Sequence, residues 1–240
     1  MDEPYCGLWQ PGIAWVRQWN PDPAAWALLA LAVAMVLAGR RARRGPRLLA
    51  LAVAALLWLS PLCPLSATLL SARVGHHVAV MLVFAPLAAC AWPAARRWPV
   101  SVAGIAAVAA MVAWFVPAAY AWAWRSDAGY WLLQAAMALA AWQLWLGWFR
   151  AAAGDEREVV AATGALAMLA LAMGMVAAVL AFAPRLLLVE HLLAAPLLGI
   201  DPLADQRIAG LAMWTLGMLP LGLVAALSLR GRLATRVASG

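Results

Sequence analysis

The sequence has no lysine and few charged residues of any kind. Charged residues make up 11% of the 240 residues and hydrophobic residues 67%, whereas roughly 25% of an ordinary soluble protein is charged. A water-soluble chain of this length could not bury so much apolar surface, so we predict an integral membrane protein. The missing lysine also excludes a retinal photoreceptor, because a retinal Schiff base requires an amine.

Familiar catalytic motifs are also missing. The sequence contains neither a G-x-S-x-G nucleophile elbow nor an H-E-x-x-H zinc motif. The apolar stretches that we predict to cross the membrane contain no aspartate, glutamate or lysine. We therefore do not expect an enzyme.

Seven apolar stretches are candidates for transmembrane helices, which need about 20 largely apolar residues each. The predicted spans are Ala24–Gly39, Leu48–Leu65, Val78–Ala95, Val100–Val116, Tyr130–Phe149, Val159–Ala183 and Ile208–Leu229. Asp22 before Pro23, and Asp201 before Pro202, predict helix starts, since aspartate caps a helix and proline fits its first position.

The predicted fold class is therefore all-α, a polytopic transmembrane helix bundle of about seven spans. A single integral membrane domain covers residues 1–240, with an external N-terminal segment at 1–23 and a cytoplasmic tail at 230–240.

Arginine placement predicts the orientation, because short cytoplasmic loops carry an excess of positive charge. With the N-terminus outside and the C-terminus in the cytoplasm, twelve of the seventeen arginines fall inside and five outside. The inner set is Arg40, Arg41, Arg43, Arg44, Arg47, Arg96, Arg97, Arg150, Arg157, Arg230, Arg232 and Arg236, and the outer set is Arg17, Arg73, Arg125, Arg185 and Arg207. The net charge of +7 is thus a topology signal, and we expect the lipid bilayer, not nucleic acid, as a partner.

All three histidines, His76, His77 and His191, fall near the predicted outer face. On a helix His77 and Met81 share a face, and imidazole with thioether suits Cu(I). We therefore predict a metal site from His77, Met81, His76 and His191, with the histidines close together. The alternatives are that Met81 packs in the core, that His77 bonds a loop carbonyl, and that Glu190 and His191 form a solvated pair.

Two of the three cysteines, Cys6 and Cys63, are predicted outside, where oxidation is favoured. The sequence allows two roles for these cysteines: they could form a disulfide with each other, or a thiolate could contribute to a copper site. Gly210 and Gly217 in the last span, and Gly164 and Gly174 in the sixth, are expected to let helices approach closely. Asp205 is expected to complement the dipole of the last helix.

Three spaced patterns at the outer ends are more specific. The first comprises Ser60-Pro61-Leu62, Leu65-Ser66, Ser71-Ala72, His77, Met81 and Ala85-Pro86-Leu87; the second comprises Pro117, Tyr120 and Arg125; the third comprises Pro202, Leu203, Ala204, Asp205, Gln206, Gly210, Met213 and Trp214. In order and spacing they resemble the CtaG-type cytochrome c oxidase assembly factors, a family of bacterial seven-span membrane proteins, from about Trp19 to Leu229.

The resemblance implies a multi-pass protein of the bacterial inner membrane that assists assembly of a haem-copper oxidase of the respiratory chain. Its partners would be oxidase subunits. Copper, inserted at the outer face, would be the candidate cofactor. The structural or partner motif would be Pro117, Tyr120, Pro202, Asp205, Gln206, Gly210 and Trp214. The family usually has histidine where this chain has Arg73, Tyr130 and Gln134, which favours a chaperone or scaffolding role over copper delivery.

A small-molecule or metal-ion transporter is the alternative function. Transporters usually place a buried charge or an interrupted helix near the middle of the membrane. Apart from Pro220 in the last span, the predicted spans show little sign of either feature.

Overall fold

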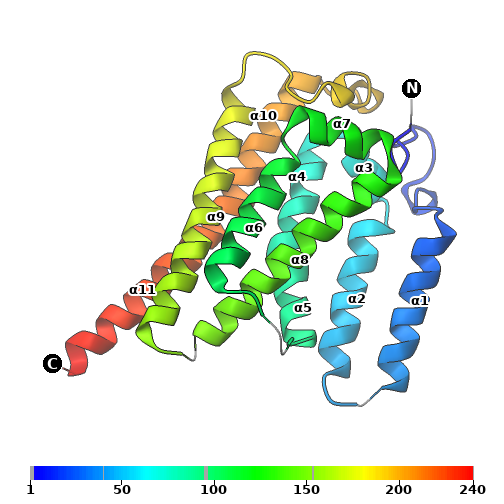
Figure 1. Ribbon diagram of the computed structural model, residues 1–240. Coiled ribbons are helices and arrows are strands. Elements are labelled where there is room, and N and C mark those ends of the chain that lie inside the picture. The colour runs from blue at the N-terminus through cyan, green and yellow to red at the C-terminus, as the bar shows by residue number, and fades with distance from the viewer. Residues whose placement is uncertain (1–2, 40, 95–96, 153, 240) are drawn as a thin grey trace.

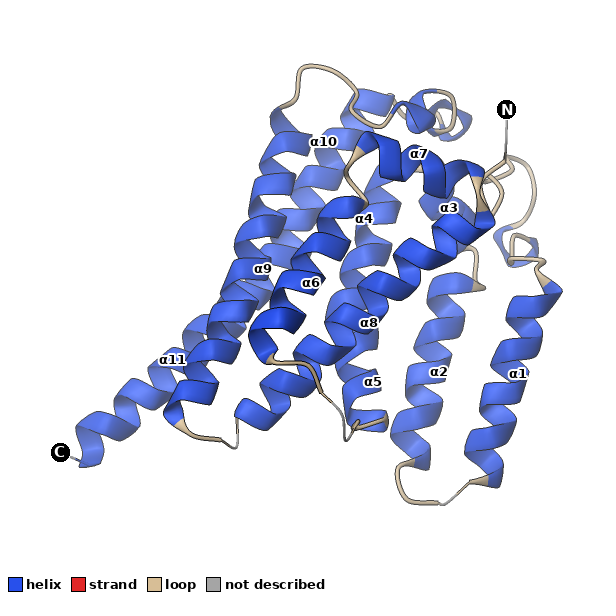
Figure 2. Ribbon diagram, viewed as in Figure 1, coloured by secondary structure: helices blue, strands red, loops and turns tan. Residues whose placement is uncertain are grey.

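The computed structural model describes residues 3–39, 41–94, 97–152 and 154–239, which form helices and loops without a strand among them (Figure 2). The predicted all-α class is therefore confirmed. Arg40, Ala95 and Arg96, which we assigned to span ends or to the inner arginine set, lie outside these ranges, as does Gly240.

The α-helices are α1 Pro23–Ala38, α2 Arg44–Trp58, α3 Leu62–Thr68, α4 Leu70–Ala79, α5 Ala85–Ala91, α6 Val100–Ala113, α7 Pro117–Arg125, α8 Asp127–Ala151, α9 Glu156–Phe182, α10 Pro202–Ala212 and α11 Leu219–Ser239. Short 3-10 helices cover Trp15–Arg17, Val189–Leu192 and Ala195–Leu198, and π-helical segments cover Val80–Phe84 and Met213–Met218.

Four helices are long and apolar enough to cross a membrane, namely Leu70–Ala91, Asp127–Ala151, Glu156–Phe182 and Pro202–Ser228. The number rises to six if the bent pairs α2 with α3 and α6 with α7 each count as one span. The helix α1 has 16 residues and falls short of that test. The described residues therefore support four to six spans, and the predicted seven are not confirmed.

The chain ends lie at opposite ends of the bundle (Figure 1). The N-terminal segment lies at the same end as α3, α7 and the long loop between α9 and α10, and we call this the N-terminal end. The connections from α1 to α2, α5 to α6 and α8 to α9 lie at the other end, where α11 projects away from the bundle.

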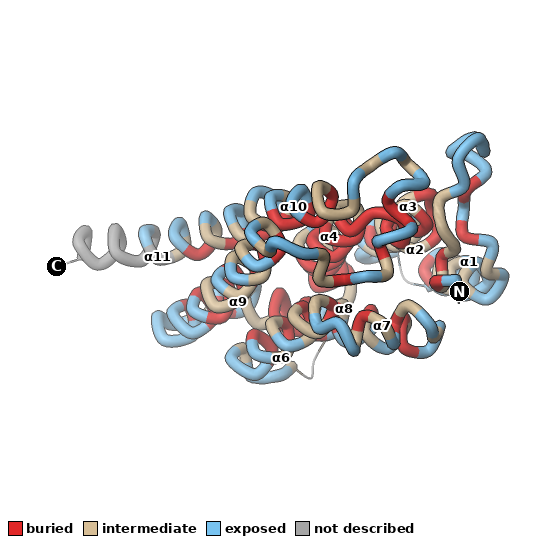
Figure 3. Tube along the Cα trace, turned by 90° about the horizontal axis from the view of Figure 1, so that it is seen from above, coloured by how far each residue is buried: buried red, intermediate tan, exposed pale blue. Residues whose placement is uncertain are grey.

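The helix α4 lies at the centre of the bundle, where Figure 3 shows buried residues on all sides of it. It packs against α3 and α10, and the rest of its span against α8. The span begins at Leu70 rather than at the predicted Val78. Its first turns carry Arg73, His76 and His77, whose polarity hid the helix start in the sequence, but these side chains face protein and are at most 3% exposed.

Two other boundaries depart from prediction because of proline. The predicted second span is divided by Ser60 and Pro61 into α2 and α3, which meet at 40°. The predicted fourth span ends earlier than Val116, and Pro117 starts α7 at 73° to α6. Proline has no N–H and cannot continue the hydrogen-bond ladder of a helix.

The predicted helix starts at the two aspartates are confirmed. Asp22 accepts a hydrogen bond from the Ala24 N–H, with Pro23 in the first position of α1. Asp201 caps α10 in the same way through the Ala204 N–H.

Candidate functional site

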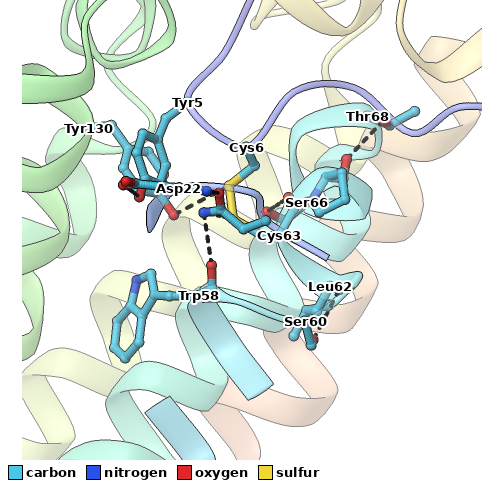
Figure 4. The surroundings of a disulfide bond; sticks show 12 residues. Tyr5, Cys6, Asp22, Trp58, Ser60, Leu62, Cys63, Ser66, Thr68 and Tyr130 are labelled. Carbon is cyan, nitrogen blue, oxygen red and sulfur yellow. Dashed lines mark hydrogen bonds between the residues drawn. A yellow bond between two sulfur atoms is a disulfide. The ribbon is translucent and has the colours of Figure 1, made fainter. Parts of the chain in front are cut away.

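A disulfide bond joins Cys6 to Cys63 and fastens the N-terminal segment to α3 (Figure 4). Of the two possibilities open for these cysteines, the structure contains the disulfide. The Trp9 N–H donates to the Thr68 hydroxyl at 2.7 Å, and the Tyr5 hydroxyl donates to the Asp22 carboxylate. Tyr5 also stacks on Tyr130 of α8 at 4.9 Å. The N-terminal segment is thus part of the folded end of the bundle.

Asp205 caps the N-terminus of α4 from a different helix. Its carboxylate accepts hydrogen bonds from the Leu70 N–H at 2.6 Å, from the Ser71 N–H at 3.2 Å and from the Ser71 hydroxyl. A helix start leaves N–H groups without intrahelical partners, and the residue before α4, Leu69, has no side chain that could cap them. Asp205 is 1% exposed. It is therefore a buried link between α10 and α4.

This geometry corrects two expectations about the last span. The span begins at Pro202 and not at Ile208, so Asp205 lies inside it, and the statement that no span holds an acidic residue is wrong. The Asp205 carboxylate accepts hydrogen bonds from the N-terminus of α4, and it also lies in the first turn of its own helix, α10. Helix ends of this kind stabilise a nearby negative charge.

His191 is completely buried in the loop between α9 and α10. Its Nδ1 lies 3.1 Å from the Thr68 carbonyl oxygen, and its Nε2 lies 2.6 Å from the Tyr120 hydroxyl. Because a carbonyl can only accept, Nδ1 carries the proton and Tyr120 donates to Nε2. Burial lowers the pKa of His191 to about 4, so the ring is neutral at pH 7. A solvated pair with Glu190 is therefore wrong.

A second group of polar side chains is buried between α4, the end of α6 and α8. We call it the Arg73 cluster and define it as Arg73, His76, His77, Trp114, Tyr130 and Gln134. All six are at most 3% exposed. The Arg73 guanidinium carbon lies 5.6 Å from the ring centres of both Trp114 and Tyr130, and His77 lies against Trp114 at 4.5 Å.

Most polar atoms of the Arg73 cluster lack a hydrogen-bond partner. These atoms are Nε and Nη1 of Arg73, both ring nitrogens of His76 and His77, Nε1 of Trp114, and both amide atoms of Gln134. A bond from His77 to a loop carbonyl is therefore wrong. Buried polar groups are nearly always paired, so such a concentration calls for an explanation.

The predicted metal ligands make different ring contacts. His76 and His77 are in ring contact at 5.7 Å, whereas His191 contacts Tyr120 and Trp124. Met81 is buried, in agreement with core packing. Within the part of the chain that the structure describes, no three side chains of histidine, cysteine, aspartate or glutamate are grouped so that they could hold a metal ion.

Each π-helical segment ends two residues before a proline, Pro86 in one case and Pro220 in the other. The missing proline N–H shifts the ladder to longer i→i+5 bonds, as from Ala85 to Val80. The freed Met81 carbonyl accepts a hydrogen bond from Trp145 Nε1 at 2.8 Å. The interruptions are thus built into the sequence and compensated by packing.

Other residues of the predicted motif hold the helices together. Gln206 bonds the Leu180 and Arg185 carbonyls and the Leu187 N–H, and so fixes the end of α9. Trp214 Nε1 donates to the Gly174 carbonyl at 3.0 Å. A Cβ at Gly210 would lie 2.6 Å from the Ala177 carbonyl oxygen. Close approach is confirmed there and at Gly174 and Gly217, but it is wrong for Gly164, which has no atom within 4 Å of a Cβ position.

Sequence reasoning missed the Arg73 cluster as a unit. We placed Arg73 with the outer arginines, and Tyr130 and Gln134 entered only through the family comparison. A signal was present, since Arg73, His76 and His77 interrupt an apolar stretch at helical spacing, which places them on neighbouring faces of one helix.

The fold and the site define a class: a helical membrane protein whose polar and aromatic side chains gather in a packed core at one end. The family model described as cytochrome c oxidase caa3 assembly factor (Caa3_CtaG) matches residues 30–234, most of the chain. The protein belongs to this family, and the resemblance drawn from the sequence motifs is confirmed. Comparisons with curated proteins and with solved structures gave no match.

Proposed function

We propose that this protein assists the assembly of a haem-copper oxidase in the bacterial inner membrane and that it acts as a scaffold or chaperone for oxidase subunits. Membership of the caa3 assembly factor family carries this proposal. The way the site is built supports it. Asp205, Gln206 and the Cys6–Cys63 disulfide each make contacts that hold helices or loops in place.

We further propose that the chain crosses the membrane seven times, with the N-terminal end outside. The seventh crossing would be α1, which runs alongside α2 from one end of the bundle to the other (Figure 1). Its 16 residues span about 24 Å, and arginines at a helix end can extend to the headgroups. Arg41, Arg43 and Arg97 lie in the loops at the opposite end, and Arg44 begins α2 there; this excess of positive charge supports a cytoplasmic position. A cytoplasm-specific reporter should be active after Gly240 and silent at Ser126.

Insertion of copper at the outer face is a second version of the proposal, with His77, Met81, His76 and His191 as candidate ligands. The unpartnered nitrogens of His76 and His77 support it. The test is to load the detergent-purified protein with Cu(I) and to compare it with a His77→Ala variant. Equal copper in both proteins would remove His77 from the site.

Transport of a small molecule or metal ion is the competing function. The sequence showed little sign of the features typical of transporters, but the structure contains two of them. Arg73 and Asp205 are buried charges inside spans, and π-helical segments interrupt two spans. However, Arg73 lies in the first turn of a 22-residue span, about 5 Å from its start, and so away from the midplane where transporters place their sites.

Deletion of the gene separates these functions. For an assembly factor, the oxidase polypeptides are still made, but the purified oxidase has less haem or copper and lower activity. Added copper should restore activity if the protein delivers copper, by mass action, and should have little effect if it is a scaffold. Normal oxidase activity and metal content in the deletion strain would contradict both versions and favour transport.

A further inference from the structure

Arg73 is a buried cation, and two of its three guanidinium nitrogens have no hydrogen-bond acceptor among the described residues. It is 3% exposed on the first turn of α4. Trp114 and Tyr130 lie near its guanidinium at 5.6 Å, which offers favourable cation–π contacts. Those contacts do not use the N–H groups, and Nε and Nη1 have no acceptor. An arginine has five N–H donors and no acceptor of its own, so it requires acceptors from elsewhere.

No carboxylate of the described residues supplies these acceptors to Nε or Nη1. Asp205 is the only buried acidic side chain in the described parts of the chain. Both of its oxygens are occupied by Leu70 and Ser71 at the start of α4. A buried charge is costly unless it is paired and hydrogen-bonded. The fold therefore leaves a positive charge without a hydrogen-bonded counter-charge.

The neighbours of Arg73 are also mainly donors. The indole N–H of Trp114 and both amide atoms of Gln134 are unpartnered within the described residues, and each ring of His76 and His77 has an N–H donor. The hydroxyl oxygens of Tyr120 and Tyr130 also face the guanidinium and can accept from it, but they leave Nε and Nη1 without an acceptor. Positive charge and an excess of donors both favour a ligand that is negative and only accepts hydrogen bonds.

We propose that the Arg73 cluster binds one small monovalent inorganic anion of the halide type. Arg73 would supply the charge, and the N–H groups of Trp114 and Gln134 would supply further donors. The packing limits the size of the ligand, because His77 lies 4.5 Å from Trp114 and every member of the cluster is nearly inaccessible to solvent. This inference does not depend on the function in oxidase assembly.

Equilibrium dialysis with radioactive chloride tests the proposal on the full-length protein in detergent, in a sulfate buffer of constant ionic strength. We expect one saturable chloride site per chain, from which bromide but not sulfate displaces the label. Arg73→Gln should lower the affinity at least tenfold. Arg207→Gln is the matched control, since Arg207 is an exposed arginine on α10, and it should bind chloride like the unaltered protein.

Two further variants keep the test decisive if Arg73→Gln does not fold. Arg73→Lys retains the charge and loses the forked donor, and Gln134→Leu removes a neutral donor. Both should still bind one chloride, with an affinity lowered about fivefold or more. Absence of saturable binding in the unaltered protein would overturn the proposal and would mean that water satisfies these groups. Unchanged affinity in both Arg73→Lys and Gln134→Leu would overturn it too, because the site would then lie elsewhere.

Discussion

Replacing Asp205 by alanine is the sharpest perturbation of the N-terminal end. Among the described residues Asp205 alone caps α4 with a side chain, so the change leaves the Leu70 and Ser71 N–H groups without acceptors. Loss of a helix cap costs about 0.5–2 kcal/mol, and a further buried donor left unsatisfied costs about 1–3 kcal/mol. Leu70 is 1% exposed, so water cannot easily replace the carboxylate. We expect the free energy of unfolding to fall by about 1.5–5 kcal/mol.

Two companion variants calibrate this effect. Asp205→Asn retains one acceptor oxygen but turns an amide NH₂ toward other donors, and it should lose about half as much stability. Asp201→Ala removes an exposed cap from the same helix, α10, and should cost only about 1 kcal/mol.

The assay is reversible unfolding in mixed micelles with increasing SDS, followed by tryptophan fluorescence and combined with hydrogen exchange at the start of α4. Asp205→Ala should accelerate exchange at Leu70 and Ser71, whereas Asp201→Ala should not. A loss of stability no larger than that of Asp201→Ala, with unchanged exchange in α4, would refute the capping role.

Three further predictions concern other contacts. The pKa of His191 is about 4 in the folded protein and roughly 6.5 in the unfolded chain. The neutral, buried ring therefore contributes fully to the free energy of unfolding above pH 6.5, and this contribution falls as the pH drops toward 4. The loss reaches about 3 kcal/mol, and SDS unfolding at several pH values should show it as a difference between the unaltered protein and His191→Gln. In the same assay Gly210→Ala should cost about 1–3 kcal/mol through overpacking, while Gly164→Ala should be neutral or stabilising because its Cβ position is free. Replacing Cys6 and Cys63 by serine opens a loop with a sequence separation of 57 and should cost about 4 kcal/mol in the chain-entropy model, with faster proteolysis of the N-terminal segment.

The sequence was most informative where hydropathy and capping agree. The starts of α1 and α6 match prediction to within about a residue, because Asp22 with Pro23, and Pro99, mark abrupt changes from loop to apolar helix. The start of the central span at Leu70 was misplaced. Hydropathy counts Arg73 and His77 as unfavourable in lipid, but it cannot know that other helices, and not lipid, surround them.

The candidate site, too, could be predicted only in part from the sequence. The motif residues Asp205, Gln206 and Gly210 could be found from spacing, but their partners could not, since Leu70 and Leu187 contribute only backbone N–H groups. Every sequence position carries such groups, so no residue type reveals which ones a distant side chain will bind. The Cys6–Cys63 disulfide remained one of two possibilities for a similar reason. Cysteine placement permits a bond but does not bring the two sulfur atoms together.

Arg73 also bears on the choice between scaffolding and copper delivery. Side chains one helical turn apart lie about 6 Å from each other, and Arg73 and His77 are four residues apart on α4. Two unit positive charges at that distance repel each other by about 3 kcal/mol at an effective dielectric constant of 20, which weakens binding about 100-fold. A copper ion on His77 would meet that repulsion unless an anion neutralised Arg73. An unneutralised Arg73 therefore favours the scaffolding version of the proposal, and an anion bound there is the condition under which copper delivery through His77 would be electrostatically reasonable.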